Sequence, residues 1–100
     1  MVQCPKRAEE KEMKAVILIK FRKKPTREVI AQNVKMLEMG EKEGVKNLSL
    51  HWTLGRYDAV AVTEAPNEKA IMKQLIKMSD NISTETLIAI PAEEARKLAE

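Results

Sequence analysis

The sequence predicts a single α+β domain with the element order β-α-β-β-α-β, an antiparallel four-stranded sheet and a short C-terminal helix. Three observations predict this fold class. Apolar runs of strand length alternate with stretches whose apolar residues recur at helical spacing. Two of the strand-like runs meet at a tight turn between Leu54 and Ala59. The length of 100 residues suits one domain.

The first predicted strand is the unbroken aliphatic run from Met13 to Arg22, which is typical of a central strand covered on both faces. Pro25 and Thr26 then open a helix, with Thr26 as its N-cap. Apolar residues recur along this helix with the spacing of one buried stripe, at Ile30, Val34 and Leu37. Gly40 or Gly44 can supply the left-handed residue that ends it.

The central hairpin follows. Residues 45–54 alternate between apolar and polar side chains, and residues 59–63 return as the partner strand. A two-residue loop would place Trp52 on one face with Ala59, whereas a three-residue loop would place Leu54 opposite Asp58. These two registers differ in every facing pair of side chains.

The loop length therefore decides the surroundings of His51 and Thr53. The longer loop gathers large apolar residues on the helix side and turns His51 and Thr53 towards a partner subunit. The large residues in that case are Leu50, Trp52, Val60 and Val62. The shorter loop groups His51 and Thr53 with Asp58 on the face that bears Val60 and Val62.

The second half of the chain repeats the pattern. Asn67 is the predicted N-cap of a second helix, whose inner face carries Ile71, Leu75 and Met78. Residues 82–90 form the fourth predicted strand, and Pro91 permits a last short helix. Right-handed crossovers place the first and third strands in the middle of the sheet and both helices on one face. Because the first strand is apolar on both faces, we expect a second subunit to cover the open face.

A resemblance to a known family lies in the hairpin. The stretch from Trp52 to Asp58, WTLGRYD, together with residues 83–87, resembles the GYD-domain family. The Gly, Tyr and Asp of the family signature stand here at Gly55, Tyr57 and Asp58. The resemblance runs from about Val16 to about Leu98. It implies a ferredoxin-like fold of the dimeric α+β barrel type, in which two sheets pack face to face, and it implies no particular activity.

Candidate functional residues gather in the same region. His51 is the only side chain whose ordinary pKa lies near neutrality, and a carboxylate such as Asp58 or Glu85 could orient it as a general base. Thr53, Tyr57 and Glu85 are candidates for ligand binding. Structural interpretations compete with these roles. His51 would then be a polar interface or surface residue, and Tyr57 and Asp58 would be turn residues.

Three functions follow from these residues. The first is a homodimer or higher homo-oligomer that binds a small organic molecule in an intersubunit cleft. The second is a cofactor-independent isomerase or monooxygenase with His51 as the base. The third is a structural or regulatory assembly module without a small ligand. We expect no cofactor; a haem ligand role for His51 would depend on a single imidazole.

Composition excludes several other classes. Cys4 is the only cysteine, so the chain has no disulfide framework or zinc site of its own. The 18 basic residues are interleaved with 15 acidic ones, and the predicted central strands lack stacking aromatics, which argues against nucleic acid. No apolar stretch approaches membrane-spanning length. We expect a cytoplasmic protein with a flexible tail over residues 1–12 and one GYD-like domain over residues 13–100.

Overall fold

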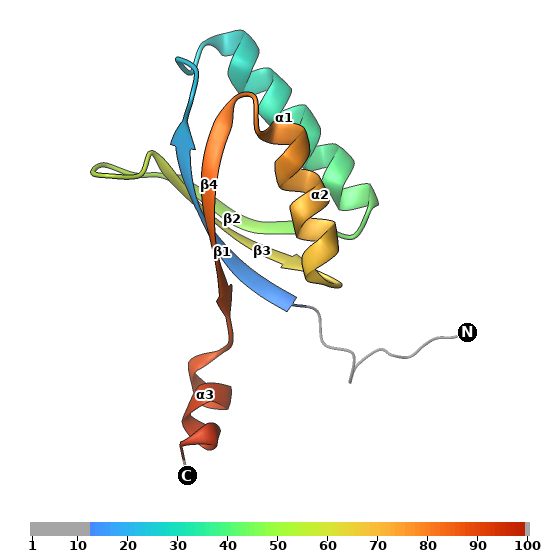
Figure 1. The fold of residues 1–100 in the computed structure, drawn as a ribbon, viewed down its shortest axis with the longest axis vertical. Helices are drawn as coiled ribbons and strands as arrows, with labels where there is room; N and C mark the ends of the chain where they lie inside the picture. The colour runs from blue at the N-terminus through green and yellow to red at the C-terminus, as the bar shows by residue number, and fades with distance from the viewer. Residues whose placement is uncertain (1–12, 100) are drawn as a thin grey trace.

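The computed structural model describes residues 13–99, so the predicted tail over residues 1–12 lies outside the described residues. Four antiparallel strands form one sheet in the order β2-β3-β1-β4 (Figure 1). The strands are β1 (Met13–Phe21), β2 (Lys46–Trp52), β3 (Ala59–Ala65) and β4 (Ile82–Ala89). The predicted order of elements is confirmed, with the first and third strands in the middle.

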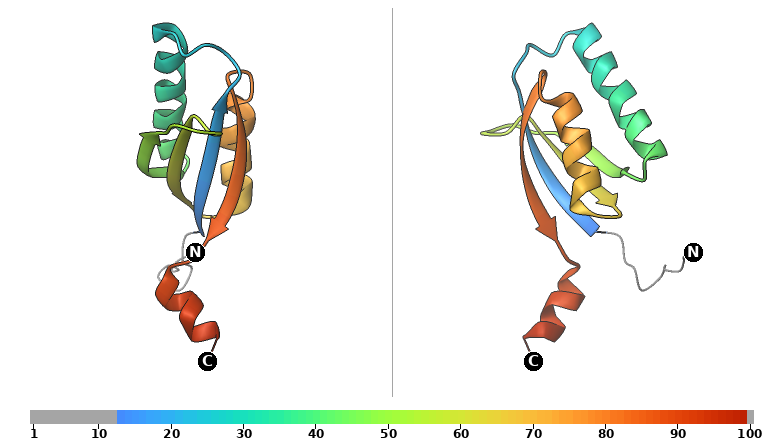
Figure 2. Two further views of the ribbon diagram at one scale, coloured as in Figure 1. Left: turned by 90° about the vertical axis from the view of Figure 1, so that its left-hand side faces the viewer. Right: turned by 45° about the vertical axis from the view of Figure 1, so that its right-hand side comes forward.

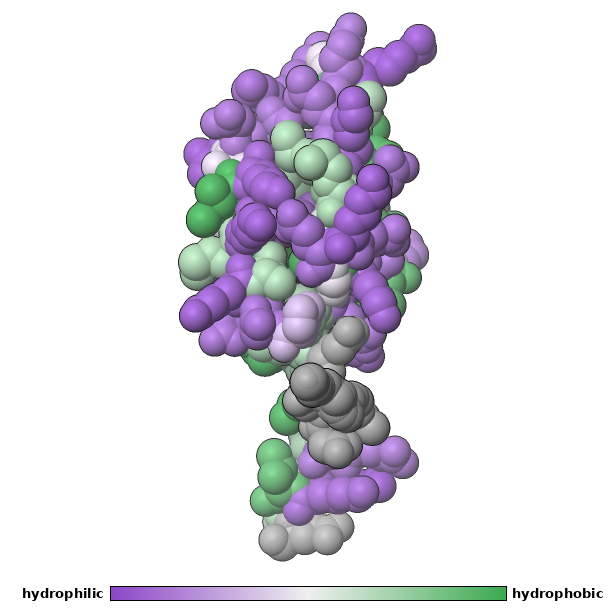
Figure 3. All heavy atoms as spheres, turned by 90° about the vertical axis from the view of Figure 1, so that its right-hand side faces the viewer, coloured by the Kyte–Doolittle hydropathy of each residue, from purple (hydrophilic) through white to green (hydrophobic). Residues whose placement is uncertain are grey.

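Two helices, α1 (Arg27–Lys42) and α2 (Glu68–Met78), lie side by side on one face of the sheet (Figure 2). The opposite face carries no helix among the described residues. This arrangement is the ferredoxin-like α+β fold that the sequence predicts. Charged and polar residues dominate the helix-bearing side of the molecule (Figure 3). None of the helices within residues 13–99 is long and apolar enough to cross a membrane.

Local sequence signals fix the ends of both long helices. The Thr26 hydroxyl accepts a hydrogen bond from the Val29 N–H at 3.3 Å, and the Asn67 side chain accepts one from the Ala70 N–H at 3.0 Å. Both predicted N-caps are thus confirmed. Gly44, with a φ of 94°, ends α1, because the left-handed turn there costs little without a side chain.

The third helix, α3 (Ala92–Leu98), begins after Pro91, as predicted. It projects beyond the end of the sheet and buries none of its residues (Figures 1 and 2). Leu98 is among the exposed large apolar residues of the chain. Without tertiary packing, so short a helix has little stability of its own.

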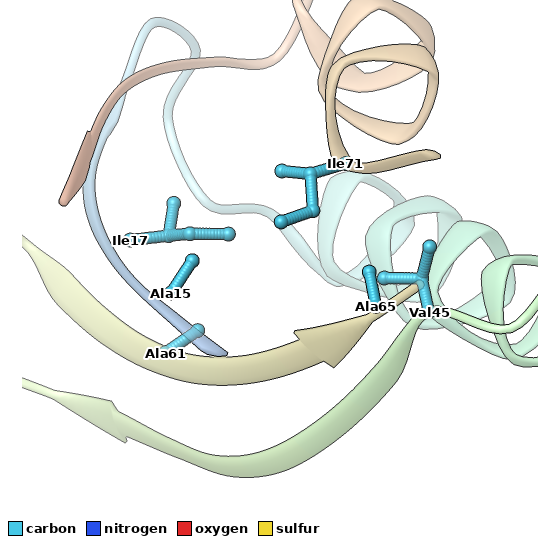
Figure 4. Close-up of a cluster of buried hydrophobic side chains, with 6 residues drawn as sticks. All are labelled: Ala15, Ile17, Val45, Ala61, Ala65 and Ile71. Atoms are coloured by element: carbon cyan, nitrogen blue, oxygen red, sulfur yellow. The ribbon is translucent and has the colours of Figure 1, made fainter. Parts of the chain in front are cut away.

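The core lies between the two middle strands and α2. Strand residues, three of which are alanines, pack against Ile71 of α2 and against Val45, which leads into β2 (Figure 4). The strand members of this cluster are Ala15, Ile17, Ala61 and Ala65. Because side chains alternate along a strand, the residues between them in β1 and β3, such as Val16, Leu18, Val60 and Val62, point to the open face.

The hairpin adopts the register expected for the shorter loop. Trp52 lies opposite Ala59. The alternative with the longer loop, which places Val60 and Val62 on the helix side, is therefore wrong. The loop itself is longer than either predicted length, because the Thr53 N–H donates to the Asp58 carbonyl at 2.9 Å and the turn spans residues 54–57. An irregularity between Asn47 and Ser49 then shifts the alternation in β2, which turns Asn47 towards the helices.

Candidate functional site

Asp58 ties the hairpin to the central strand. Its carboxylate accepts a hydrogen bond from the Phe21 N–H at 2.8 Å, and its own N–H donates to the Ile19 carbonyl at 2.8 Å. The predicted structural role was to accept N–H groups of the turn, but the bonded N–H belongs to the neighbouring strand. Asp58 therefore completes the β1–β3 ladder where the main-chain pairing ends.

Tyr57 connects the loop to the far edge of the sheet. Its hydroxyl donates a hydrogen bond to the Glu85 carboxylate on β4, so two of the predicted ligand-binding residues contact each other. This hydrogen bond is the main reason why the pKa of Tyr57 is raised above its ordinary value, because it favours the neutral phenol. Behind it, the Thr53 hydroxyl donates to the Tyr57 carbonyl at 2.7 Å.

His51 stands apart from both carboxylates within one chain. It is exposed on the edge strand β2, and strand pairing places it in one row with Val60, Leu18 and Glu85. Three strand spacings, about 14 Å, separate the two ends of that row. Within residues 13–99, His51 makes no hydrogen bond or ion pair with Asp58 or Glu85. A general base oriented by a carboxylate stays a prediction.

A shallow groove lies at the end of the sheet, where β1 leaves it and the hairpin begins. Thr53 and Asp58 line it together with Phe21 and Trp52, and the segment after β1 adds basic side chains. These basic residues are Arg22, Lys23 and Lys24. The groove can therefore attract a small anion. No three His, Cys, Asp or Glu side chains of the described part of the chain lie close enough together to hold a metal ion.

Sequence analysis did not single out Asn47, which the structure places on the helix side of β2. Its side-chain oxygen is buried and has no hydrogen-bond partner among the described residues. Simple alternation in residues 45–54 assigns Asn47 to the polar face with His51, and only the irregularity in β2 turns it inward. A bulge of this kind leaves no local sequence signal here.

Comparison with known proteins identifies the family of this chain and several structures of similar fold. The GYD domain model matches residues 18–99, so the chain belongs to the GYD domain family. No curated protein matches the sequence significantly.

Several solved structures share the fold. The leucine response regulatory protein of Mycobacterium tuberculosis is 15% identical with a TM-score of 0.58, and the match covers 79% of this chain and 51% of that one. A feast or famine regulatory protein from M. tuberculosis, complexed with L-methionine, is 14% identical with a TM-score of 0.60, covering 91% and 58%. FFRP-DM1 is 24% identical with a TM-score of 0.55, covering 78% and 99%. The chain thus spans little more than half of the two regulators, and the likeness concerns the fold alone.

Proposed function

We propose that this GYD domain self-associates through its open sheet face and binds a small organic molecule at the hairpin end of that assembly. The observation that carries the proposal is the composition of the open face. Its centre holds the aliphatic side chains of Val16, Leu18, Val60, Val62 and Leu87. A contiguous apolar surface of this kind is unusual on a lone domain and is typical of an interface.

The occupant that fits this face is a second copy of the chain. A two-fold interface must be complementary to itself, and the rim of the face carries both signs of charge. At one end, the Lys14 ammonium nitrogen lies 4.0 Å from a carboxylate oxygen of Glu64. Lys20 and Glu85 lie towards the other end. A two-fold axis along the strands would place His51 opposite Glu85 of the partner subunit, because these residues stand at the two ends of one row across the sheet. That contact would supply the carboxylate that His51 lacks in its own chain.

The basic groove at the end of the sheet favours a small organic acid as the ligand. Arg22, Lys23 and Lys24 provide positive charge, and Thr53 and Asp58 provide polar atoms beside it. Charge-assisted contacts to a carboxylate are stronger than neutral ones. The regulator of similar fold that is complexed with L-methionine has an amino acid as its ligand, which makes amino acids the first compounds to test here.

A charge in the middle of the open face tests self-association. Val62→Asp should raise the dissociation constant about 30-fold or more, because central interface residues each contribute about 2 kcal/mol or more. Sedimentation equilibrium at micromolar concentration measures the change. Ile76→Asp, on an exposed part of α2, is the matched control and should leave association unchanged. A wild-type monomer, or a Val62→Asp variant that still associates normally, would contradict the proposal.

A charge reversal in the groove tests the ligand. Isothermal titration calorimetry with L-methionine and other amino acids should detect binding to the wild-type protein. Lys23→Glu should weaken it about tenfold, since a lost charge-assisted contact is worth about 1.5 kcal/mol. Lys35→Glu, exposed on α1, serves as the control. If Lys23→Glu and Lys35→Glu bind equally well, the groove is not the site.

A further inference from the structure

The loop between β2 and β3 rises from the open face of the sheet. We call its residues 54–57 the flap. Lys20 of β1 and Glu85 of β4 belong to the open face, because they alternate with residues that point to the helices. Lys20 donates to the Arg56 carbonyl at 3.1 Å, and Tyr57 donates to Glu85, so the flap overhangs this face. Figures 1 and 2 show the loop projecting from the side of the sheet that carries no helix.

Hydrogen bonds at its base hold the flap to the sheet. The Thr53 N–H donates to the Asp58 carbonyl at 2.9 Å, and the Thr53 hydroxyl donates to the Tyr57 carbonyl at 2.7 Å. Asp58 is in turn bonded to the Phe21 N–H of β1. Gly55 has a φ of 115°, a conformation that residues with a side chain rarely adopt. The family signature of Gly55, Tyr57 and Asp58 therefore shapes the flap and anchors it over the open face.

The flap holds an apolar side chain in water. Leu54 is 102% exposed, the highest value among the large apolar side chains of residues 13–99. A Cβ atom added at the neighbouring Gly55 would meet nothing within 4 Å among these residues beyond its two chain neighbours. Leu54 thus gains no burial within its own chain. Contact with another molecule would remove its apolar area from water.

A second copy of the chain is the molecule that the flap would meet. The flap and the aliphatic centre of the open face lie on the same side of the sheet, so one partner would contact both. Sheets that pack face to face lie about 10 Å apart. A flap that projects from one sheet on the packed side would therefore reach the partner subunit.

We propose that the flap is part of the interface between two copies of the chain and that Leu54 is buried against the partner subunit. This inference rests on the self-association proposed above and gives the GYD loop a role in it. Tyr57 and Asp58 act as positioning residues, because they hold the flap at the sheet and leave Leu54 to make the contact.

Labelling of a single cysteine tests whether association buries the flap. Leu54→Cys in a Cys4→Ser background places the only thiol at position 54. Sedimentation equilibrium gives the dissociation constant of this variant. At roughly 100 times that concentration, maleimide should label the thiol about tenfold more slowly than in dilute solution, because mass action leaves fewer than about a tenth of the chains free. Met72→Cys in the same background, exposed on α2, is the matched control and should label equally fast at both concentrations.

The labelling distinguishes the flap from self-association itself. Adding Val62→Asp, which should prevent association, should restore fast labelling at position 54 at both concentrations. If the Leu54→Cys variant associates but its labelling rate does not depend on concentration, the role of the flap is overturned and self-association stands. A wild-type protein that stays monomeric overturns both.

A truncation tests the contribution of the side chain. Leu54→Ser should raise the dissociation constant about tenfold or more, since burial of a leucine side chain is worth at least roughly that factor. Met72→Ser should leave it unchanged. The flap adjoins the basic groove, so an anionic lipid surface is the other occupant to test. If Leu54→Ser associates normally but loses wild-type binding to vesicles of equal parts phosphatidylcholine and phosphatidylglycerol, Leu54 contacts lipid and the proposal is overturned.

Discussion

The two faces of the sheet carry opposite kinds of side chain, although the same strands supply both. In β3, the helix side holds Ala59, Ala61 and Ala65, all buried, whereas the open side holds Val60 and Val62, which are half-buried. The bulkier residues thus lie on the face that no helix covers. Small residues let α2 approach closely, while the bulky residues on the uncovered face form the apolar surface on which the proposed self-association rests.

The same comparison explains why the helix side is hollow. Beneath α2, Ile71 fills the space above the alanines and is 4% exposed. Beneath α1, Val34 and Leu50 remain 46% and 41% exposed, and a cavity between this helix and the strands stays open. One face is therefore packed within the chain, and the other is the face for which we propose association between chains.

The largest expected effect is on the free energy of unfolding. It distinguishes packing within the chain from the proposed association between chains. Ile71→Ala should lower the free energy of unfolding by about 2–5 kcal/mol, because it removes a buried side chain and leaves a cavity. The loss should not depend on protein concentration. Val62→Ala should cost less in dilute solution, and its cost should grow with concentration as association contributes to stability. Denaturant unfolding over a range of concentrations measures both. If both losses behave alike, the distinction between the faces is wrong.

The next largest effect on stability is expected where α1 and α2 contact each other, at Gly40 and Gln74. A methyl group at Gly40 would collide with the buried amide of Gln74, so Gly40→Ala should cost about 1–3 kcal/mol. Chemical denaturation measures the loss. In a Gln74→Ala background the same substitution should cost much less, because the collision is removed. An unchanged cost in that background would show that Gln74 does not set the distance between the helices.

A smaller effect on stability is expected at the end of β1, where Asp58 joins the hairpin to this strand. Asp58→Ala removes the acceptor of the Phe21 N–H and should cost about 1 kcal/mol. Thermal unfolding measures it, with Asp80→Ala at an exposed loop position as the control. Equal stability of the two variants would mean that the hairpin is held to β1 by the main chain alone.

The smallest expected effect is on the pKa of Tyr57, which contacts Glu85 at the rim of the open face. Tyr57 is the only tyrosine, so the phenolate absorbance of the folded protein reports its pKa directly. Glu85→Gln should lower this raised pKa towards its ordinary value of about 10. Since the pKa is raised in the folded state, the contribution to stability is present below pH about 10 and is lost as the pH rises through the raised pKa. A titration unchanged by Glu85→Gln would rule out this contact.

Much of the fold could be predicted because its signals are local. Thr26 and Asn67 cap their helices through atoms only three residues away, and Gly44 ends α1 within one turn. The apolar runs likewise specify the strands. The resemblance carried by Gly55, Tyr57 and Asp58 led to the family to which the chain belongs. The candidate site was less predictable. Asp58 has its main partner on β1, and Tyr57 has its partner on β4.

The sequence by itself determined the order of elements, the ends of the helices and an aliphatic first strand that is apolar on both faces. Tertiary structure alone decided which residues share a face. The register of the hairpin moved Val60 and Val62 to the open side, and the irregularity in β2 turned Asn47 towards the cavity. The physical reason is that strand pairing joins residues far apart in the chain, and a shift of one residue reverses every side chain that follows.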